Sequence, residues 1–279
     1  MLSKGYGGAV YGVDAQIITI EVNIVDGLHL KLTGLPDSAV KESEYRIESV
    51  FKHNHFRMPR RRIVGNMAPA DIRKEGSAYD LPMALCILNS SGQISISEEK
   101  LSGYMMMGEL ALDGTLRPIK GVLPIAIEAR KKGFKGFILP IENANEAAIV
   151  NDLDIIGVNN IMEAIAYLEG TQDIEPLEYD TRDKFFTDLN NYEADFSNVQ
   201  GQENIKRALE IAAAGGHNVI MIGPPGAGKT MLAKRLPSIL PPLSLQEALE
   251  TTKIHSVAGK MGSNADLITR RPFRSPHHT

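Results

Sequence analysis

The chain has 279 residues, of which 43% are hydrophobic and 23% charged, and its formal net charge is −4. This composition excludes disorder throughout, and the length suggests two domains. The single cysteine, Cys86, excludes an internal disulfide and favours a reducing compartment. The sequence contains neither a signal-peptide pattern nor a run of about 18 apolar residues. We therefore expect a soluble, cytoplasmic protein with no membrane segment.

The first predicted elements are two strands and a helix. Residues 17–24 alternate apolar and polar positions, a period of two that is typical of a half-buried strand. The apolar face of that strand consists of Ile18, Ile20, Val22 and Ile24. Residues 27–33 repeat the pattern and are predicted to pair with the first strand. Residues 36–51 follow as a predicted helix. Its apolar stripe is formed by Val40, Ile47, Val50 and Phe51.

Four arginines stand close together after this helix, namely Arg57, Arg60, Arg61 and Arg62. Each presents a planar fork of N–H donors that suits phosphate, so the cluster is a candidate DNA contact. Because the net charge is negative, any contact with nucleic acid has to be local. The alternative is a solvated, charged strand edge that discourages aggregation. The absence of interleaved aromatic residues favours this alternative.

Strands and helices alternate through the next hundred residues. A helix at 81–88 would bury Cys86, whose thiol is expected to have no catalytic role. Residues 104–119 predict a hairpin around the Asp113-Gly114 turn. Further helices are predicted at 122–132, 144–150 and 161–168, and further strands at 137–139 and 154–157.

This pattern divides the chain into two domains and a linker. Residues 1–170 are predicted to form a domain of α/β or α+β type. Residues 171–195 are acidic and lack a clear period, which predicts an interdomain linker. Residues 196–279 form the second predicted domain, in which a helix at 205–214 precedes a short apolar strand at 218–222.

A phosphate-binding motif follows that strand directly. It matches the pattern G-x-x-x-x-G-K-[ST] and leads into a predicted helix at 229–236, which is the context that such a loop requires. Its residues are Gly223, Pro224, Pro225, Gly226, Ala227, Gly228, Lys229 and Thr230. The glycines let the backbone approach phosphate oxygens, which the loop amides would hold. Lys229 would lie near the β- and γ-phosphates of ATP, and the Thr230 hydroxyl would ligate Mg²⁺.

A phosphate loop alone does not hydrolyse a nucleotide. Hydrolysis also needs an acidic residue at the end of a second strand. No run of four apolar residues that ends in Asp-Glu occurs between Thr230 and Thr279, and the second domain is short for a nucleotide-binding α/β domain. We therefore expect a truncated chain that binds ATP weakly, holds no catalytic residue and does not turn ATP over.

Several segments carry a resemblance to a known family. Residues 196–230 (FSNVQGQENIKRALEIAAAGGHNVIMIGPPGAGKT) and the terminal RPFRSPHHT resemble the AAA+ module of magnesium chelatase-like ATPases. Residues 11–47, from YGVDAQ to SEYRI, resemble the YifB/ComM branch of that family. The resemblance implies a Lon-protease-like domain of the ribosomal-S5 type, fused to a homo-hexameric AAA+ motor. It further implies an ATP-driven helicase that drives branch migration of recombining DNA in natural transformation.

The same resemblance assigns site residues. It places Val199, Gln200 and Gly201 where AAA+ proteins line the adenine pocket, and residues 223–230 at the phosphates. The acidic motif, the sensor residues and the arginine finger of the family have no counterpart before Thr279.

The Lon-like resemblance raises the question of peptidase activity. Lon-type proteases use a serine nucleophile that a lysine activates. The positions that match the serine and the last glycine of its motif hold Ala78 and Asp80, and those that match the lysine hold Leu123 and Ile125. A one-residue shift that pairs Ser77 with Lys120 would restore the dyad. We expect instead a non-catalytic scaffold that places subunits in a ring.

The histidines do not predict a metal site. His53 and His55 share no face of a helix, and the adjacent His277 and His278 would point to opposite faces of a strand. No cysteine and histidine spacing of the zinc type occurs. The metal expected is therefore Mg²⁺ with ATP.

Two other functions remain as alternatives to the DNA motor. A magnesium chelatase-like ATPase that remodels a partner protein would share the same AAA+ motifs. A non-enzymatic interaction domain would keep only the folded scaffold. A Lon-type peptidase is disfavoured by Ala78 and Leu123.

Overall fold

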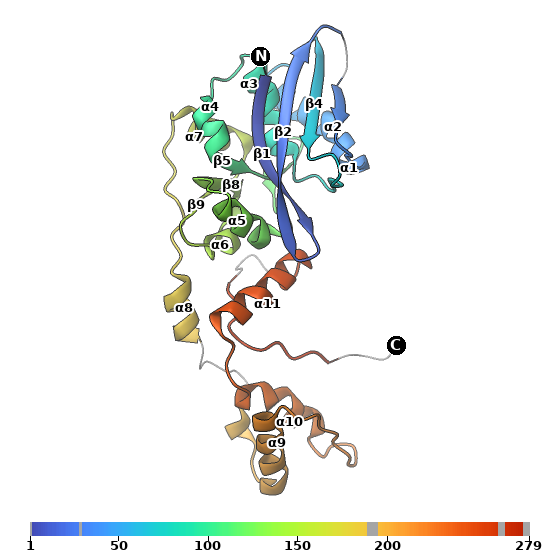
Figure 1. The fold of residues 1–279 in the computed structure, drawn as a ribbon, viewed down its shortest axis with the longest axis vertical. Coiled ribbons are helices and arrows are strands. Elements are labelled where there is room, and N and C mark those ends of the chain that lie inside the picture. Colours follow the sequence, from blue (N-terminus) through green and yellow to red (C-terminus); the bar gives the residue numbers. More distant parts are fainter. Residues whose placement is uncertain (1, 28–29, 189–194, 262–265, 276–279) are drawn as a thin grey trace. The chain divides into compact units, whose positions relative to one another are not determined.

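The computed structural model describes residues 2–27, 30–188, 195–261 and 266–275 (Figure 1). The chain divides into two compact units. Unit 1 comprises residues 1–181 and 252–266, and unit 2 comprises residues 182–251 and 267–279. None of the described helices is long and apolar enough to cross a membrane.

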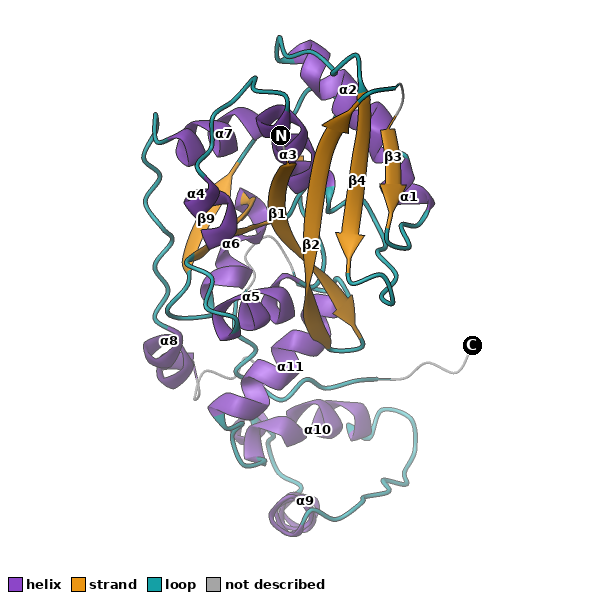
Figure 2. Cartoon of the chain, turned by 45° about the horizontal axis from the view of Figure 1, so that its top comes forward, coloured by secondary structure: helices purple, strands orange, loops and turns teal. Residues whose placement is uncertain are grey.

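Unit 1 is built on a seven-stranded sheet with the order β3-β4-β2-β1-β5-β8-β9 (Figure 2). The strands are β1 (Leu2–Tyr11), β2 (Asp14–Val25), β3 (Leu30–Thr33), β4 (Arg62–Ala68), β5 (Tyr104–Met106), β8 (Gly136–Pro140) and β9 (Asp154–Val158). The β1–β2 and β2–β4 pairs are antiparallel, and the other neighbouring strands are parallel. The expected α/β class is therefore confirmed, with a mostly parallel sheet.

Helices cover this sheet because their apolar stripes need a surface to pack on. They are α1 (Ser38–Lys41), α2 (Ser43–His53), α3 (Asp80–Ser90), α4 (Glu98–Gly103), α5 (Val122–Lys131), α6 (Ile141–Ala148) and α7 (Ile161–Glu169). All eleven residues of α3 are buried. Both α3 and α5 pack against β1 and β2, so these two strands lie at the centre of the core.

The first strand, β1, has no counterpart among the sequence predictions. Its glycines weaken a strand signal, but they let the helices approach closely. A Cβ atom at Gly5 would lie 2.9 Å from the sulfur of Cys86 in α3, and one at Gly8 would lie 2.7 Å from Ile125 in α5. The glycines that make β1 hard to predict from sequence are therefore the residues that its close packing against α3 and α5 requires.

Two other predictions need correction, and the predicted linker proves to include a helix. Residues 30–33 pair in parallel with β4 and not with β2, because β4 occupies the free edge of β2. Residues 104–106 join the large sheet, so the hairpin around Asp113-Gly114 shrinks to β6 (Glu109–Leu110) and β7 (Leu116–Arg117). The expected linker contains a helix, α8 (Thr181–Asp188), whose Phe185 side chain is buried.

The described secondary-structure elements of unit 2 are helices and 3₁₀ turns. The unit contains 3₁₀ turns at Phe196–Asn198 and Leu236–Ile239, the helices α9 (Glu203–Gly215) and α10 (Lys229–Arg235), and the first part of α11 (Leu245–Val257). A small core of Phe196, Val199, Leu209 and Leu232 joins the first 3₁₀ turn to α9 and α10.

The predicted strand at 218–222 is not formed. Ile220 and Ile222 are 84% and 90% exposed, and no strand of unit 2 is described that could share backbone hydrogen bonds with them. A strand acquires its structure from a neighbour, so an apolar run without one stays irregular.

A largely buried ion pair joins α2 to α3. Arg46 donates to both carboxylate oxygens of Asp80 at 2.6 and 2.9 Å, and the Asp80 side chain is only 1% exposed. The N–H of Leu110 donates to the same carboxylate at 3.2 Å. Asp80 is therefore a structural residue that ties two helices and β6 together.

We expect Arg46→Ala to lower the free energy of unfolding by about 3–5 kcal/mol, because it leaves a buried carboxylate without its cation. Urea unfolding of the purified chain measures this. Arg130→Ala is the matched control, since Arg130 and Asp152 form a pair whose side chains are 50% and 79% exposed. Its loss should stay below about 1 kcal/mol. Equal losses for the two variants would contradict the structural role of Asp80.

Candidate functional site

The phosphate-binding motif forms an exposed loop at the start of α10. Gly226 and Gly228 both have a φ of 81°, a left-handed conformation that side chains other than glycine rarely adopt. Gly228 is the residue before the first turn of α10, which begins at Lys229 as predicted. The two glycines therefore produce the turn that brings the loop back to the helix.

Lys229 folds over this loop. Its ammonium group donates to the carbonyl oxygens of Gly223 and Pro224 at 2.7 and 2.8 Å. An ammonium group has three N–H donors on a flexible stem, so it can exchange a carbonyl for a phosphate oxygen without moving its backbone. The structure thus brings the cation and the first half of the motif together.

The segment predicted to line the adenine pocket lies just before α9. Val199 is buried in the small core of unit 2, whereas Gln200 is exposed and Gly201 has a φ of 67°. A Cβ atom on Gly228 would lie 3.7 Å from the side-chain amide of Gln202. Gln202 therefore lies beside the loop, although the sequence analysis did not select it. Gln202 and Gly228 are far apart in sequence, so it is the packing of the chain that brings them together.

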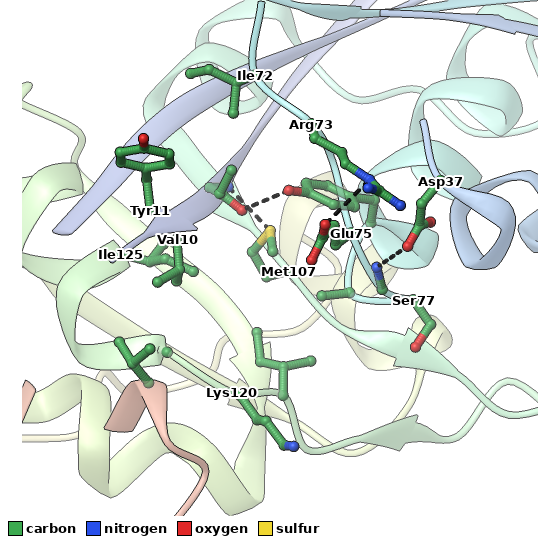
Figure 3. A pocket seen from close by; sticks show the side chains of 18 of the residues that line it. Val10, Tyr11, Asp37, Ile72, Arg73, Glu75, Ser77, Met107, Lys120 and Ile125 are labelled. Carbon is green, nitrogen blue, oxygen red and sulfur yellow. Dashed lines mark hydrogen bonds and ion pairs between the residues drawn. The ribbon is translucent and has the colours of Figure 1, made fainter. Parts of the chain in front are cut away.

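Unit 1 contains a pocket of about 960 Å³ that includes the residues considered for peptidase activity (Figure 3). Ser77, Ala78, Lys120 and Ile125 all line it, and Leu123 is buried in α5. The Ser77 hydroxyl donates to Glu109, whose other carboxylate oxygen faces Arg117 at 3.4 Å. No hydrogen bond between Ser77 and Lys120 occurs among the described residues, and Figure 3 shows their side chains apart. The geometry aims Ser77 at a carboxylate instead of an amine.

The four arginines separate into two places in the structure. Arg57, Arg60 and Arg61 line a second pocket of about 700 Å³ in unit 1. Arg62, at the start of β4, lies against Gly27, where a Cβ atom would be 2.9 Å from its guanidinium. All four are exposed. Three of the four clustered arginines therefore share a pocket, and Arg62 lies outside it.

The remaining candidates have structural positions. Cys86 is fully buried in α3, as predicted. His53 ends α2 and His55 follows it with a φ of 63°. His277 and His278 lie outside the described residues.

Two family models match the chain. One is described as "Subunit ChlI of Mg-chelatase" and covers residues 20–143. The other is described as "Magnesium chelatase, subunit ChlI" and covers residues 195–279, which include the phosphate loop.

Proteins with matching sequences extend this finding. The chain is 44% identical over 277 residues to the "Uncharacterized protein YifB" of Salmonella typhimurium, covering 97% of the chain and 52% of that relative. It is 38% identical over 275 residues to the "Competence protein ComM" of Haemophilus influenzae, covering 98% of the chain and 53% of that relative. The chain thus spans about half the length of these relatives.

A weaker match concerns part of the chain only. The "Lon protease" of Rhizobium meliloti is 32% identical over 112 residues, which are 38% of the chain and 13% of that protein. This similarity in part of the chain fits the Lon-like domain that the sequence predicts.

Burial raises the pKa of the Cys86 thiol to about 12, so almost no thiolate exists at neutral pH. We expect no alkylation of the native chain by iodoacetamide at pH 8. In urea the pKa returns to about 8.5 and labelling should become rapid. Mass spectrometry of both samples checks this. Rapid labelling of the native chain would assign Cys86 to an accessible site instead.

Proposed function

The chain belongs to the YifB/ComM family of magnesium chelatase-like proteins, and from this we propose that it is the ATP-binding part of an AAA+ motor. The motor, at the length of the relatives, is an ATP-driven DNA helicase that promotes branch migration during natural transformation or recombination. The observation that carries the proposal is the phosphate loop with Lys229 folded onto it, directly before α10. The name of the Haemophilus relative, a competence protein, supports the transformation role.

In this proposal each loop residue has a defined role. Lys229 moves from the carbonyls of Gly223 and Pro224 to the phosphates of ATP. Thr230, the next residue of α10, ligates Mg²⁺ with its hydroxyl. Val199, Gln200 and Gly201 hold the adenine side. The residues fit Mg²⁺-ATP because the loop is exposed and its glycine conformations leave the backbone open.

Unit 1 has a supporting role in the proposal. It acts as a non-catalytic scaffold in a homo-hexameric ring, since Ser77 donates to Glu109 and the lysine positions hold Leu123 and Ile125. Its exposed arginines at 57, 60 and 61 contact DNA phosphates. A local basic surface of this kind is compatible with a net charge of −4. The compartment is the cytoplasm, where the DNA is.

A second candidate function is ATP-dependent remodelling of a partner protein. It is favoured by the two chelatase-subunit models, which match residues 20–143 and 195–279. The partner class separates the two candidates, because a remodelling ATPase responds to a protein and a helicase responds to DNA.

Nucleotide binding is measured by thermal unfolding of the chain with Mg²⁺-ATP. A ligand at 100 times its Kd adds about 2.7 kcal/mol to stability, so the midpoint should rise. Lys229→Ala should abolish most of this rise. Lys234→Ala is the matched control, because it removes the same charge from an exposed position of the same helix. An equal rise in all three proteins would remove the loop from the proposal.

Motor function is measured as ATP hydrolysis by a protein that contains this chain and has the length of its relatives. We expect strong stimulation by forked DNA and its loss in Lys229→Ala. Hydrolysis that DNA leaves unchanged would favour the remodelling function. The absence of any hydrolysis would leave a nucleotide-binding scaffold.

A further inference from the structure

In the loop that carries Arg57 and Arg60, both backbone groups of Arg57 are hydrogen-bonded to the side chain of Gln93. The side-chain oxygen of Gln93 accepts from the N–H of Arg57 at 2.8 Å, and its amide nitrogen donates to the carbonyl of Arg57 at 2.8 Å. The same amide nitrogen donates to the Ser91 hydroxyl at 2.9 Å. Gln93 thus satisfies both backbone groups of Arg57 as a neighbouring strand would.

The residues before Arg57 are also fixed. The N–H of Phe56 donates to the carbonyl of Phe51 at 2.8 Å, and the two rings meet edge to face at 6.3 Å. Phe51 is fully buried in the core. The loop after α2 is therefore anchored on the core side and on the Gln93 side, while its arginine side chains stay exposed.

The charges of this pocket are unbalanced. Its lining contains three arginines and no carboxylate. Arg61 is the one with a nearby anion, because its guanidinium contacts Asp26 at 2.6 Å. Among the described residues, Arg57 and Arg60 form no ion pair. Two free guanidinium groups beside a concave surface form a site for an anion with several oxygens.

We infer that this pocket binds a phosphodiester group of the DNA backbone, with Arg57 and Arg60 as its cations and Gln93 as the residue that positions Arg57. The inference rests on the proposed function, in which DNA is the partner. It names the contact within unit 1 and excludes Arg62, which lies against Gly27 and outside the pocket. Gln93 acts through the backbone of Arg57, so it touches no phosphate itself.

Asp26 limits the site. Its carboxylate faces Arg61 and is itself highly exposed, so it weakens the local positive field without stabilising the fold much. Removal of that carboxylate frees a third guanidinium for the anion. A purely structural role of this loop would not produce a gain of binding from such a change.

The experiment measures binding of the full 279-residue chain to a fluorescent 30-base-pair duplex by anisotropy, from 50 to 200 mM salt. For Arg57→Gln with Arg60→Gln, we expect about tenfold weaker binding. The slope of log K against log salt should become shallower by roughly 1, since the loss of one phosphate contact removes about 0.9. Arg130→Gln is the charge-matched control, because Arg130 is exposed and already paired with Asp152. It should leave the slope unchanged.

Three further variants test the positioning role of Gln93 and the charges that make up the site. Gln93→Ala keeps every charge but frees the Arg57 backbone, so affinity should fall severalfold while the melting temperature confirms a folded chain. Asp26→Asn should bind DNA more tightly than the wild type. Arg62→Gln should lose less affinity than the double variant.

The outcomes distinguish DNA binding by the chain from DNA binding at this pocket. If the wild type binds no DNA, the proposed DNA partner is wrong. If the wild type binds DNA but the double variant keeps its affinity and slope, only the pocket assignment is overturned. If Gln93→Ala binds like the wild type, the positioning role of Gln93 is overturned.

Discussion

The need of every backbone N–H and C=O for a partner governs both units of this protein. In unit 1 the glycine-rich β1 is a strand because β2 pairs with it over its whole length and because β5 joins its other side at Tyr6. Beyond β5, the N–H of Gly8 points to the sulfur of Met107 and its carbonyl accepts from the Tyr79 hydroxyl. Side chains thus take over where the neighbouring strand stops.

The same constraint explains unit 2. Residues 218–222 have the apolar character of a strand, yet they remain irregular and exposed because no described strand pairs with them. In the loop that follows, the Lys229 ammonium satisfies two carbonyls that would otherwise face water. The contact keeps the cation close to the loop backbone, which is the arrangement that anion binding needs.

Most elements of the fold could be predicted from local sequence patterns. The features that the sequence analysis missed depend on pairing between segments that are distant in sequence. The buried faces of β2 and α2 follow from Ile18, Ile20 and Ile47, since alternation and helical stripes are properties of one segment. The partner of residues 30–33 and the existence of β1 depend on other segments. In the candidate site, the phosphate loop is evident from its motif, but Gln202 is brought beside it only by packing. The arginine loop is evident too, while its partner Gln93 is 36 residues away.

In unit 1, the residues at the positions compared with the Lon motif form structural contacts. Asp80, which the sequence analysis matches to the last glycine of the Lon motif, pairs with Arg46 and holds α2 against α3. Ser77 donates to Glu109, and the two residues matched to the Lon lysine, Leu123 and Ile125, are buried core residues of α5. Because α2 also anchors the arginine loop through Phe51, the Arg46–Asp80 pair stabilises the helix from which that loop leaves. The Arg46–Asp80 pair, the Phe51–Phe56 contact and Gln93 therefore all hold the base of the loop that carries Arg57, and a loop held in this way would lose little conformational entropy on binding an anion.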